Sequence, residues 1–183
     1  KDFYNIIGAI ALDAKDYVRA EAAFRKSISI EDASPVRFYL GVVCDKLGKK
    51  DAMEEEMLRA IQLDPNNAAA LNYLGYSWLT ADKNIDQAME MITRACKIEP
   101  DNGAYLDSLG WAYYKKKNLP MARTYLERAA QMEEDPEVFE HLGWVYFDSR
   151  DYERAILWWS KSLEKAPNPE IEKRIREALH LLR

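Results

Sequence analysis

The stretch Leu106-Asp107-Ser108-Leu109-Gly110-Trp111-Ala112-Tyr113 decides the fold, because its pattern recurs along the chain. Residues 71–78 and 139–146 show the same order of large apolar residue, leucine, glycine and aromatic residue at the same spacing. The glycines of this pattern are spaced 33, 34, 35 and 33 residues apart, and they are Gly8, Gly41, Gly75, Gly110 and Gly143. Self-similarity at such a period is the sequence signature of a repeat architecture.

A second set of positions follows each glycine. An alanine or methionine lies twelve residues after it, or thirteen in the third unit, and a large apolar residue lies four residues later. These large residues are Phe24, Met57, Ile92, Leu126 and Trp159. Both sets have helical spacing, which predicts two antiparallel helices per unit that pack closely where the small residues lie.

The repeat boundaries carry helix-start signals. Ser34-Pro35, Asp135-Pro136 and Asn168-Pro169 each pair an N-capping residue with proline at the first helical position. Within a single array, 1–183, we predict repeats at 1–33, 34–67, 68–102, 103–135 and 136–169. A capping helix at 170–183 should follow, since a solenoid needs to cover its last apolar face. Its predicted inner face is Ile171, Ile175, Leu179 and Leu182.

Composition excludes several classes of protein. The 183 residues are 48% hydrophobic and 31% charged, which suits a folded chain with a core. The net charge of −5 argues against nucleic acid as a partner, because a basic stripe is needed to neutralise phosphates. The longest apolar run, Ile6–Leu12, is far shorter than the roughly 20 residues that span a bilayer. The sequence begins at Lys1 without methionine, so we expect it to be part of a longer chain.

The pattern resembles the tetratricopeptide repeat family. The resemblance rests on Leu71-x-x-Leu74-Gly75-x-x-Trp78 and its counterparts at 106–113 and 139–146, and it covers residues 1–167. The first unit departs from the family pattern, because Ala11 stands where an aromatic residue is usual. The resemblance implies an all-α, right-handed superhelical solenoid of five helix-turn-helix repeats that acts by binding another protein and is not an enzyme.

A narrower resemblance is to bacterial tetratricopeptide proteins of the cell envelope. It rests on residues 72–76, on the residue inserted before Ala88 and on residues 100–111. Many such proteins are lipoproteins, and some are adaptors for a carboxyl-terminal processing protease. The resemblance therefore implies a periplasmic or outer-membrane location, with a cytoplasmic one left open, and a protease as one partner.

The first helix of each unit carries a further stripe that the helix pair does not need. At about 100° per residue, this stripe lies away from the glycine and should line the concave groove of the solenoid. Aromatic side chains with scattered polar groups suit a peptide or helix ligand. The predicted protein-binding groove consists of Tyr39, Asn72, Tyr73, Tyr76, Asp107, Ser108, Trp111, Tyr114, Glu140, His141, Trp144 and Phe147. The alternative is that these side chains only fill the space between successive first helices.

The sequence carries no residue pattern that predicts catalysis, metal binding or cofactor binding. Neither His141 nor His180 has a partner at metal-ligand or triad spacing, and Cys44 and Cys96 are interpreted as small core residues. We also expect the acidic run 54–56 to be a solvated face.

The N-terminal helix has apolar residues around more of its circumference than one pairing covers. They are Phe3, Tyr4, Ile6, Ile7, Ile10 and Leu12. We therefore expect another repeat or a second copy of the chain to stack there. Three functions stay open at this point: a protein-binding scaffold, a module that self-assembles through its ends, and an accessory domain of a larger enzyme.

Overall fold

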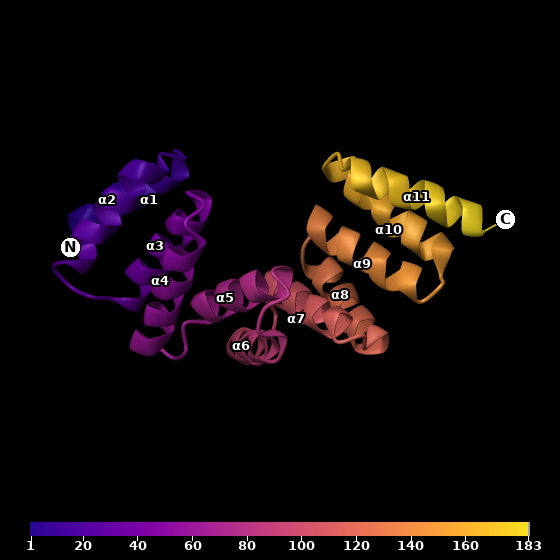
Figure 1. Cartoon of the computed structure of the whole chain (residues 1–183), viewed down its shortest axis with the longest axis horizontal. Helices are drawn as coiled ribbons and strands as arrows, with labels where there is room; N and C mark the ends of the chain where they lie inside the picture. The colour runs from indigo at the N-terminus through magenta and orange to yellow at the C-terminus, as the bar shows by residue number, and fades with distance from the viewer. Residues whose placement is uncertain (183) are drawn as a thin grey trace. The chain divides into compact units, whose positions relative to one another are not determined.

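The computed structural model describes residues 1–182 and is all-α within them (Figure 1). The chain packs as two compact units, Lys1–Ser77 and the residues from Trp78 onward. The described helices are α1 (Asp2–Asp13), α2 (Tyr17–Ile28), α3 (Ser34–Lys46), α4 (Lys50–Leu63), α5 (Ala68–Thr80), α6 (Ile85–Ile98), α7 (Gly103–Lys115), α8 (Leu119–Met132), α9 (Pro136–Asp148), α10 (Tyr152–Lys165) and α11 (Pro169–Leu181). The boundary between the units falls within α5.

Four of the five repeat glycines, Gly8, Gly41, Gly110 and Gly143, lie where the two helices of a pair approach most closely, as predicted. A Cβ atom on Gly8 would come 2.5 Å from the Phe24 ring, and one on Gly110 would come 2.6 Å from Cγ of Leu126. Gly41 faces Met57, and Gly143 faces Trp159 in the same way. Each glycine therefore contacts the large residue that the sequence assigned to the second helix, which sets the pairs α1–α2, α3–α4, α7–α8 and α9–α10.

Capping follows the sequence at two of the three predicted sites. The side chains of Asp135 and Asn168 accept hydrogen bonds from backbone N–H groups in the first turns of α9 and α11. Ser34 does not cap α3, because it is already the first helical residue and Ala33 takes the capping position. Its hydroxyl instead donates to the carbonyl oxygen of Ala60 at 2.8 Å and accepts from Asn67 Nδ2 at 2.8 Å.

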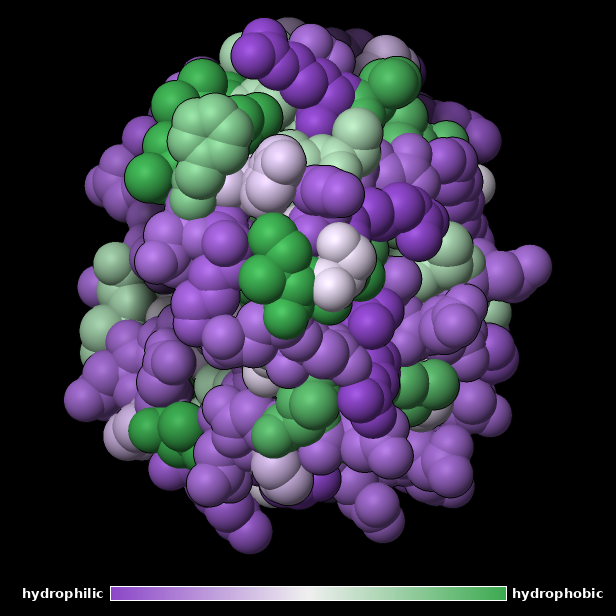
Figure 2. All heavy atoms as spheres, turned by 90° about the vertical axis from the view of Figure 1, so that its left-hand side faces the viewer, coloured by the Kyte–Doolittle hydropathy of each residue, from purple (hydrophilic) through white to green (hydrophobic). Residues whose placement is uncertain are grey.

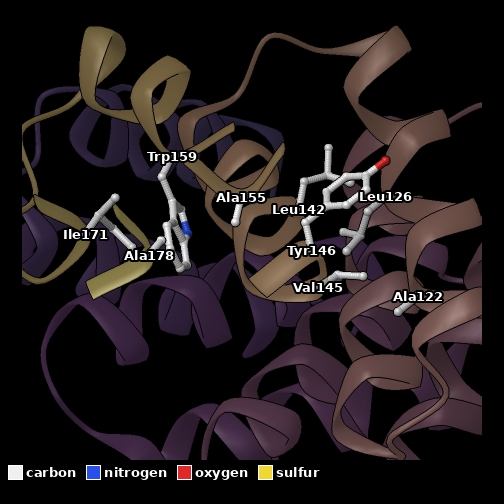
Figure 3. Close-up of a cluster of buried hydrophobic side chains, with 9 residues drawn as sticks. All are labelled: Ala122, Leu126, Leu142, Val145, Tyr146, Ala155, Trp159, Ile171 and Ala178. Atoms are coloured by element: carbon white, nitrogen blue, oxygen red, sulfur yellow. The ribbon is translucent and has the colours of Figure 1, made fainter. Parts of the chain in front are cut away.

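One buried hydrophobic cluster of the second unit runs from α8 to α11. Figure 3 shows its side chains, and these are Ala122, Leu126, Leu142, Val145, Tyr146, Ala155, Trp159, Ile171 and Ala178. Trp159 is fully buried at its centre, beside Ile171 and Ala178 from the capping helix. The predicted inner face of α11 was wrong at Leu179 and at Leu182, which are 48% and 45% exposed, and Leu182 lies just past the end of the helix. Seven residues from Ile171 return to nearly the same side of a helix, whereas eight add about 80°, so Ala178 takes the inner position.

The acidic run 54–56 is not the fully solvated face that we expected. Glu56 is only 5% exposed, and its carboxylate pairs with Nη1 of Arg37 at 2.6 Å. Arg37 also contacts Asp32 at 2.6 Å, and Asp32 pairs with Arg59 at 2.7 Å. This network ties α3 and α4 to the segment that precedes α3.

Candidate protein-binding surface

The first unit contains an open groove of about 510 Å³ between α1 and α3. Its lining is mostly apolar and consists of Asn5, Ile6, Ala9, Leu12, Asp13, Phe24, Pro35, Val36 and Tyr39. Four of these belong to the stripe of the first unit, because they lie three and two residues before Gly8 and one and four residues after it: Asn5, Ile6, Ala9 and Leu12. The Tyr39 ring stacks on Phe24, with ring centroids 5.9 Å apart, and is 47% exposed. An apolar floor with one exposed aromatic edge suits a bulky apolar side chain of a ligand.

Two polar side chains lie in this groove. Asn5 Oδ1 accepts a hydrogen bond from the Ser27 hydroxyl at 2.5 Å, which fixes the amide. Asp13 is exposed, and within residues 1–182 its carboxylate has neither a hydrogen-bond nor an ion-pair partner. The groove therefore offers one uncompensated negative charge.

The predicted residues Tyr39, Asn72, Tyr73 and Tyr76 all belong to the first unit. Tyr39 lines the groove, whereas the other three are half-buried. The Tyr73 hydroxyl donates to Asp45 Oδ2 at 2.7 Å, and its ring meets Phe38 edge to face. Burial, together with the bond to the Asp45 carboxylate, raises the pKa of Tyr73 far above its usual value, so it stays a neutral donor.

The other predicted residues lie in the second unit, where an aromatic stack joins α7 to α9. Trp111 lies between Tyr114 and His141, with ring centroids 4.5 Å and 4.0 Å away. Asp107, Ser108 and His141 are 6%, 4% and 6% exposed, so they are buried between the two helices and do not form an open ligand surface. The Ser108 hydroxyl donates to the carbonyl oxygen of Ala104.

His141 has a partner that the sequence analysis missed. Its Nδ1 lies 2.9 Å from Oδ1 of Asp107, a residue 34 positions earlier in the chain. Burial alone would lower the pKa of His141, but the charge of Asp107 and the contact with it outweigh burial, so the pKa is raised. The signal was present in the sequence, because the two residues occupy neighbouring stripe positions in successive repeats.

The remaining aromatic residues of the predicted groove are half-buried. The Arg174 guanidinium lies 4.9 Å from the centroid of the Trp144 ring, whose edge meets Trp159. Phe147 contacts Tyr152 and Trp159. Glu140 accepts a hydrogen bond from Asn168 Nδ2 at 3.0 Å, which links it to the N-terminus of α11. These contacts leave Trp144 and Phe147 partly accessible, since both residues are only half-buried.

Two family models, both described as Tetratricopeptide repeat, match residues 36–67 and 108–168. The chain belongs to the tetratricopeptide repeat family. The matched segments contain the helix pairs α3–α4 and α9–α10, with the glycine contacts described above. Among curated proteins, none matches this sequence.

Solved structures share the tetratricopeptide repeat fold with this chain at low sequence identity. A thermophilic TPR protein of Thermus thermophilus has a TM-score of 0.74 at 19% identity, over 97% of this chain and 98% of that one. PilF of Pseudomonas aeruginosa has a TM-score of 0.77 at 20% identity, over 97% and 86% of the two chains. PilW, described as a type IV pilus biogenesis factor, has a TM-score of 0.85 at 16% identity, over 98% and 86%.

In residues 1–182, no helix has the length and apolar character to cross a membrane. The same residues contain no cluster of three or more His, Cys, Asp or Glu side chains that would hold a metal ion. Cys44 is buried, as expected, and Cys96 is partly buried with its thiol donating to the carbonyl oxygen of Tyr105.

Proposed function

We propose that this tetratricopeptide repeat chain is a non-catalytic scaffold that binds a segment of another protein. The observation that supports this most directly is the open apolar groove between α1 and α3. Its size suits one or two large side chains of a peptide or helix, and its position corresponds to the stripe of first-helix residues that the repeats do not need for pairing.

The chemistry of the groove defines the kind of segment. Ile6, Leu12 and the exposed edge of Tyr39 receive a large aliphatic or aromatic side chain, because burying it removes apolar surface from water. The unpaired carboxylate of Asp13 favours a lysine or arginine next to that side chain. A protease, the partner implied by the resemblance to envelope proteins, would be one instance of such a ligand.

The half-buried aromatic residues of the second unit are proposed as a further contact surface. Trp111, Tyr114, Trp144 and Phe147 keep part of their rings accessible, and such residues often dominate binding energy. Trp144→Leu should weaken partner binding without unfolding the unit, because Trp144 flanks the core cluster rather than filling its centre. Equal losses of binding and of unfolding free energy would assign Trp144 to packing alone.

The groove is tested with peptides. A phage-displayed random peptide library is selected on the immobilised chain, and the affinity of the enriched peptides is then measured by fluorescence anisotropy. Ala9→Trp fills the groove from an exposed position, and we expect it to weaken binding by about tenfold or more, or roughly 1.4 kcal/mol. Enriched peptides should combine a large apolar side chain with a basic one.

The matched control is Ala22→Trp. Ala22 is an exposed alanine on α2 outside the groove lining, so it adds the same side chain elsewhere. Far-ultraviolet circular dichroism confirms that both variants stay folded. If no peptide is enriched, or if Ala9→Trp and Ala22→Trp bind equally well, the groove is not a peptide site.

A further inference from the structure

The aromatic surface of the second unit differs from ordinary exposed apolar surface. Figure 2 shows the end of the molecule where α1 and α2 lie, and hydrophobic side chains appear there in separate groups among hydrophilic ones, as on most proteins. In the second unit the aromatic rings are stacked on one another. Tyr114 and His141 lie nearly parallel to the Trp111 ring, with ring centroids 4.5 Å and 4.0 Å away.

Both faces of Trp111 are therefore occupied within the chain. The residue is still only half-buried, so the part of it that a ligand reaches is the edge of the indole. That edge carries one polar group, the Nε1–H donor. Nε1 of Trp111 is accessible and, like Nε1 of Trp144, has no hydrogen-bond acceptor in residues 1–182. By contrast, Nε1 of Trp159 donates to a backbone carbonyl, and Nε1 of Trp78 is buried.

The two donors are repeat-equivalent. Trp111 and Trp144 directly follow Gly110 and Gly143, on the first helices of successive repeats. α7 and α9 pack against each other, so the two indoles belong to one surface, one repeat apart. The Trp144 ring is also covered on one side, by the Arg174 guanidinium at 4.9 Å from its centroid. Donors that recur from repeat to repeat suit a ligand with acceptors at regular intervals, and a peptide backbone has them.

The charges around the indoles favour a neutral acceptor. Three cations lie against the rings of this surface, and each has a carboxylate close by. Lys115 pairs with Asp82, Arg174 pairs with Glu170 and Glu177, and Lys117 lies over the Tyr114 ring, whose hydroxyl donates to Asp148. A ligand carboxylate would therefore gain little from these cations. Carbonyl groups inside a helix already accept intrahelical hydrogen bonds, which leaves the carbonyl groups of an extended segment.

On the basis of the scaffold function proposed above, we propose that the second unit binds an extended peptide segment edge-on to its tryptophans. Backbone carbonyl oxygens of the segment accept hydrogen bonds from Nε1 of Trp111 and Nε1 of Trp144. The stacked partners of Trp111 hold the indole so that this donor points outward, and the binding energy comes from the N–H group as well as from apolar contact.

The test removes the N–H group and keeps the ring. Benzothienylalanine has nearly the shape of tryptophan, with sulfur in place of the N–H, and it replaces Trp111 or Trp144 in the 183-residue chain by site-specific incorporation. The probes are library peptides that were selected on the immobilised parent chain and that lose binding in Trp144→Leu. We expect each replacement to weaken their binding by about fivefold, the size of one hydrogen bond. Stability should not change, because volume and stacking are kept.

Trp158 is the matched control. It is half-buried on α10, outside the first-helix stripe, and its Nε1 is likewise accessible and without an acceptor in the described part of the chain. Its ring contacts Phe139 and Lys161. Benzothienylalanine in place of Trp158 should leave peptide binding unchanged.

An ester scan of the peptide identifies the acceptor. Replacing one backbone amide at a time by an ester weakens the carbonyl oxygen as an acceptor. The ester that weakens binding to the parent chain should have no further effect on the variant that lacks the matching indole N–H.

The outcomes separate this inference from the scaffold function. If no selected peptide depends on Trp144, both the second-unit surface and this inference fail. If peptides depend on Trp144 but bind the benzothienylalanine variants as tightly as the parent chain, the surface stands and the proposed hydrogen bonds are overturned. An ester scan without effect, together with lost binding when an acidic residue of the peptide is made neutral, would also overturn the inference, because the acceptor would then be a carboxylate.

Discussion

The close contacts at the repeat glycines allow a quantitative test of the helix packing, and Gly143→Ala is the most informative substitution. A Cβ atom at this position would come 2.1 Å from Cδ1 of Trp159 and 2.2 Å from its Nε1. Ordinary contact begins at about 3.4 Å, so the ring would have to move by more than an ångström. Trp159 is fully buried, and its Nε1 donates a hydrogen bond to the carbonyl oxygen of Glu140 at 3.2 Å, which leaves it little freedom to move.

The expected magnitude is the balance of three effects. Overpacking a close-packed core costs about 1–3 kcal/mol. Weakening the indole hydrogen bond costs about 1 kcal/mol. Alanine in place of glycine within a helix stabilises the folded state by about 1 kcal/mol. We therefore expect Gly143→Ala to lower the free energy of unfolding by about 2 kcal/mol, from the sum of these terms.

Gly41→Ala is the matched control, since it makes the same chemical change at the same repeat position. Its new Cβ would come 2.8 Å from Cε of Met57, which is the far end of a flexible side chain and can rotate away. Here the helical preference of alanine should offset most of the packing cost, so the net change should stay within about 0.5 kcal/mol of zero.

Urea unfolding followed by tryptophan fluorescence measures the difference. All five tryptophans lie at or after residue 78, so the signal reports on the second unit. A loss of about 2 kcal/mol should lower the midpoint by about 1 M urea. The reasoning is refuted if Gly143→Ala is as stable as the parent protein, or if Gly41→Ala, followed by circular dichroism, is destabilised equally.

Three further predictions concern polar contacts. Because the pKa of His141 is raised in the folded state, its pairing with Asp107 stabilises the protein fully below the unfolded pKa of about 6.5, and this contribution is lost as pH rises through the higher folded pKa. The unfolding free energy, measured between pH 5 and 9, should therefore fall less with rising pH in His141→Gln than in the parent protein. Identical pH profiles would contradict the pairing. Asn168→Ala removes the cap of α11, so it should lower the unfolding free energy by about 1 kcal/mol and speed amide hydrogen exchange first in that helix, whereas Asn66→Ala, in an exposed turn, should not. Arg37→Met leaves the buried carboxylate of Glu56 without its arginine partner, so the free energy of unfolding, measured by thermal unfolding, should fall by about 3 kcal/mol. Adding Glu56→Gln should recover part of this loss, and no recovery would mean that the two residues are not coupled.

The helix pairs were predictable because they depend on local periodicity. The repeat glycines and the large residues of the second helices recur with the same spacing, and the structure places Gly110 against Leu126 and Gly143 against Trp159 as that spacing predicts. The caps at Asp135 and Asn168 were predictable for the same reason, since capping involves only neighbouring residues. Ser34 was misassigned because its partners, Ala60 and Asn67, are distant in sequence.

The candidate site was predicted only in outline. The stripe on the first helices was identified, but every predicted groove residue except Tyr39 lies in the last three repeats. The open groove lies between α1 and α3, where Ala9 occupies a position that holds Trp111 and Trp144 in later repeats. The smaller side chain leaves space that the tryptophans fill, so side-chain volume at this position was the missed signal.

The sequence by itself determined that this chain is an all-α repeat protein, which helices pair and which residue of one helix meets which residue of the other. Only the tertiary structure decided which parts of the stripe stay open and that His141 and Asp107 are buried together. The physical reason is that a helical period fixes the direction of each side chain relative to its own helix. Exposure depends instead on the volumes and positions of residues one repeat away, and these are set only when the repeats pack.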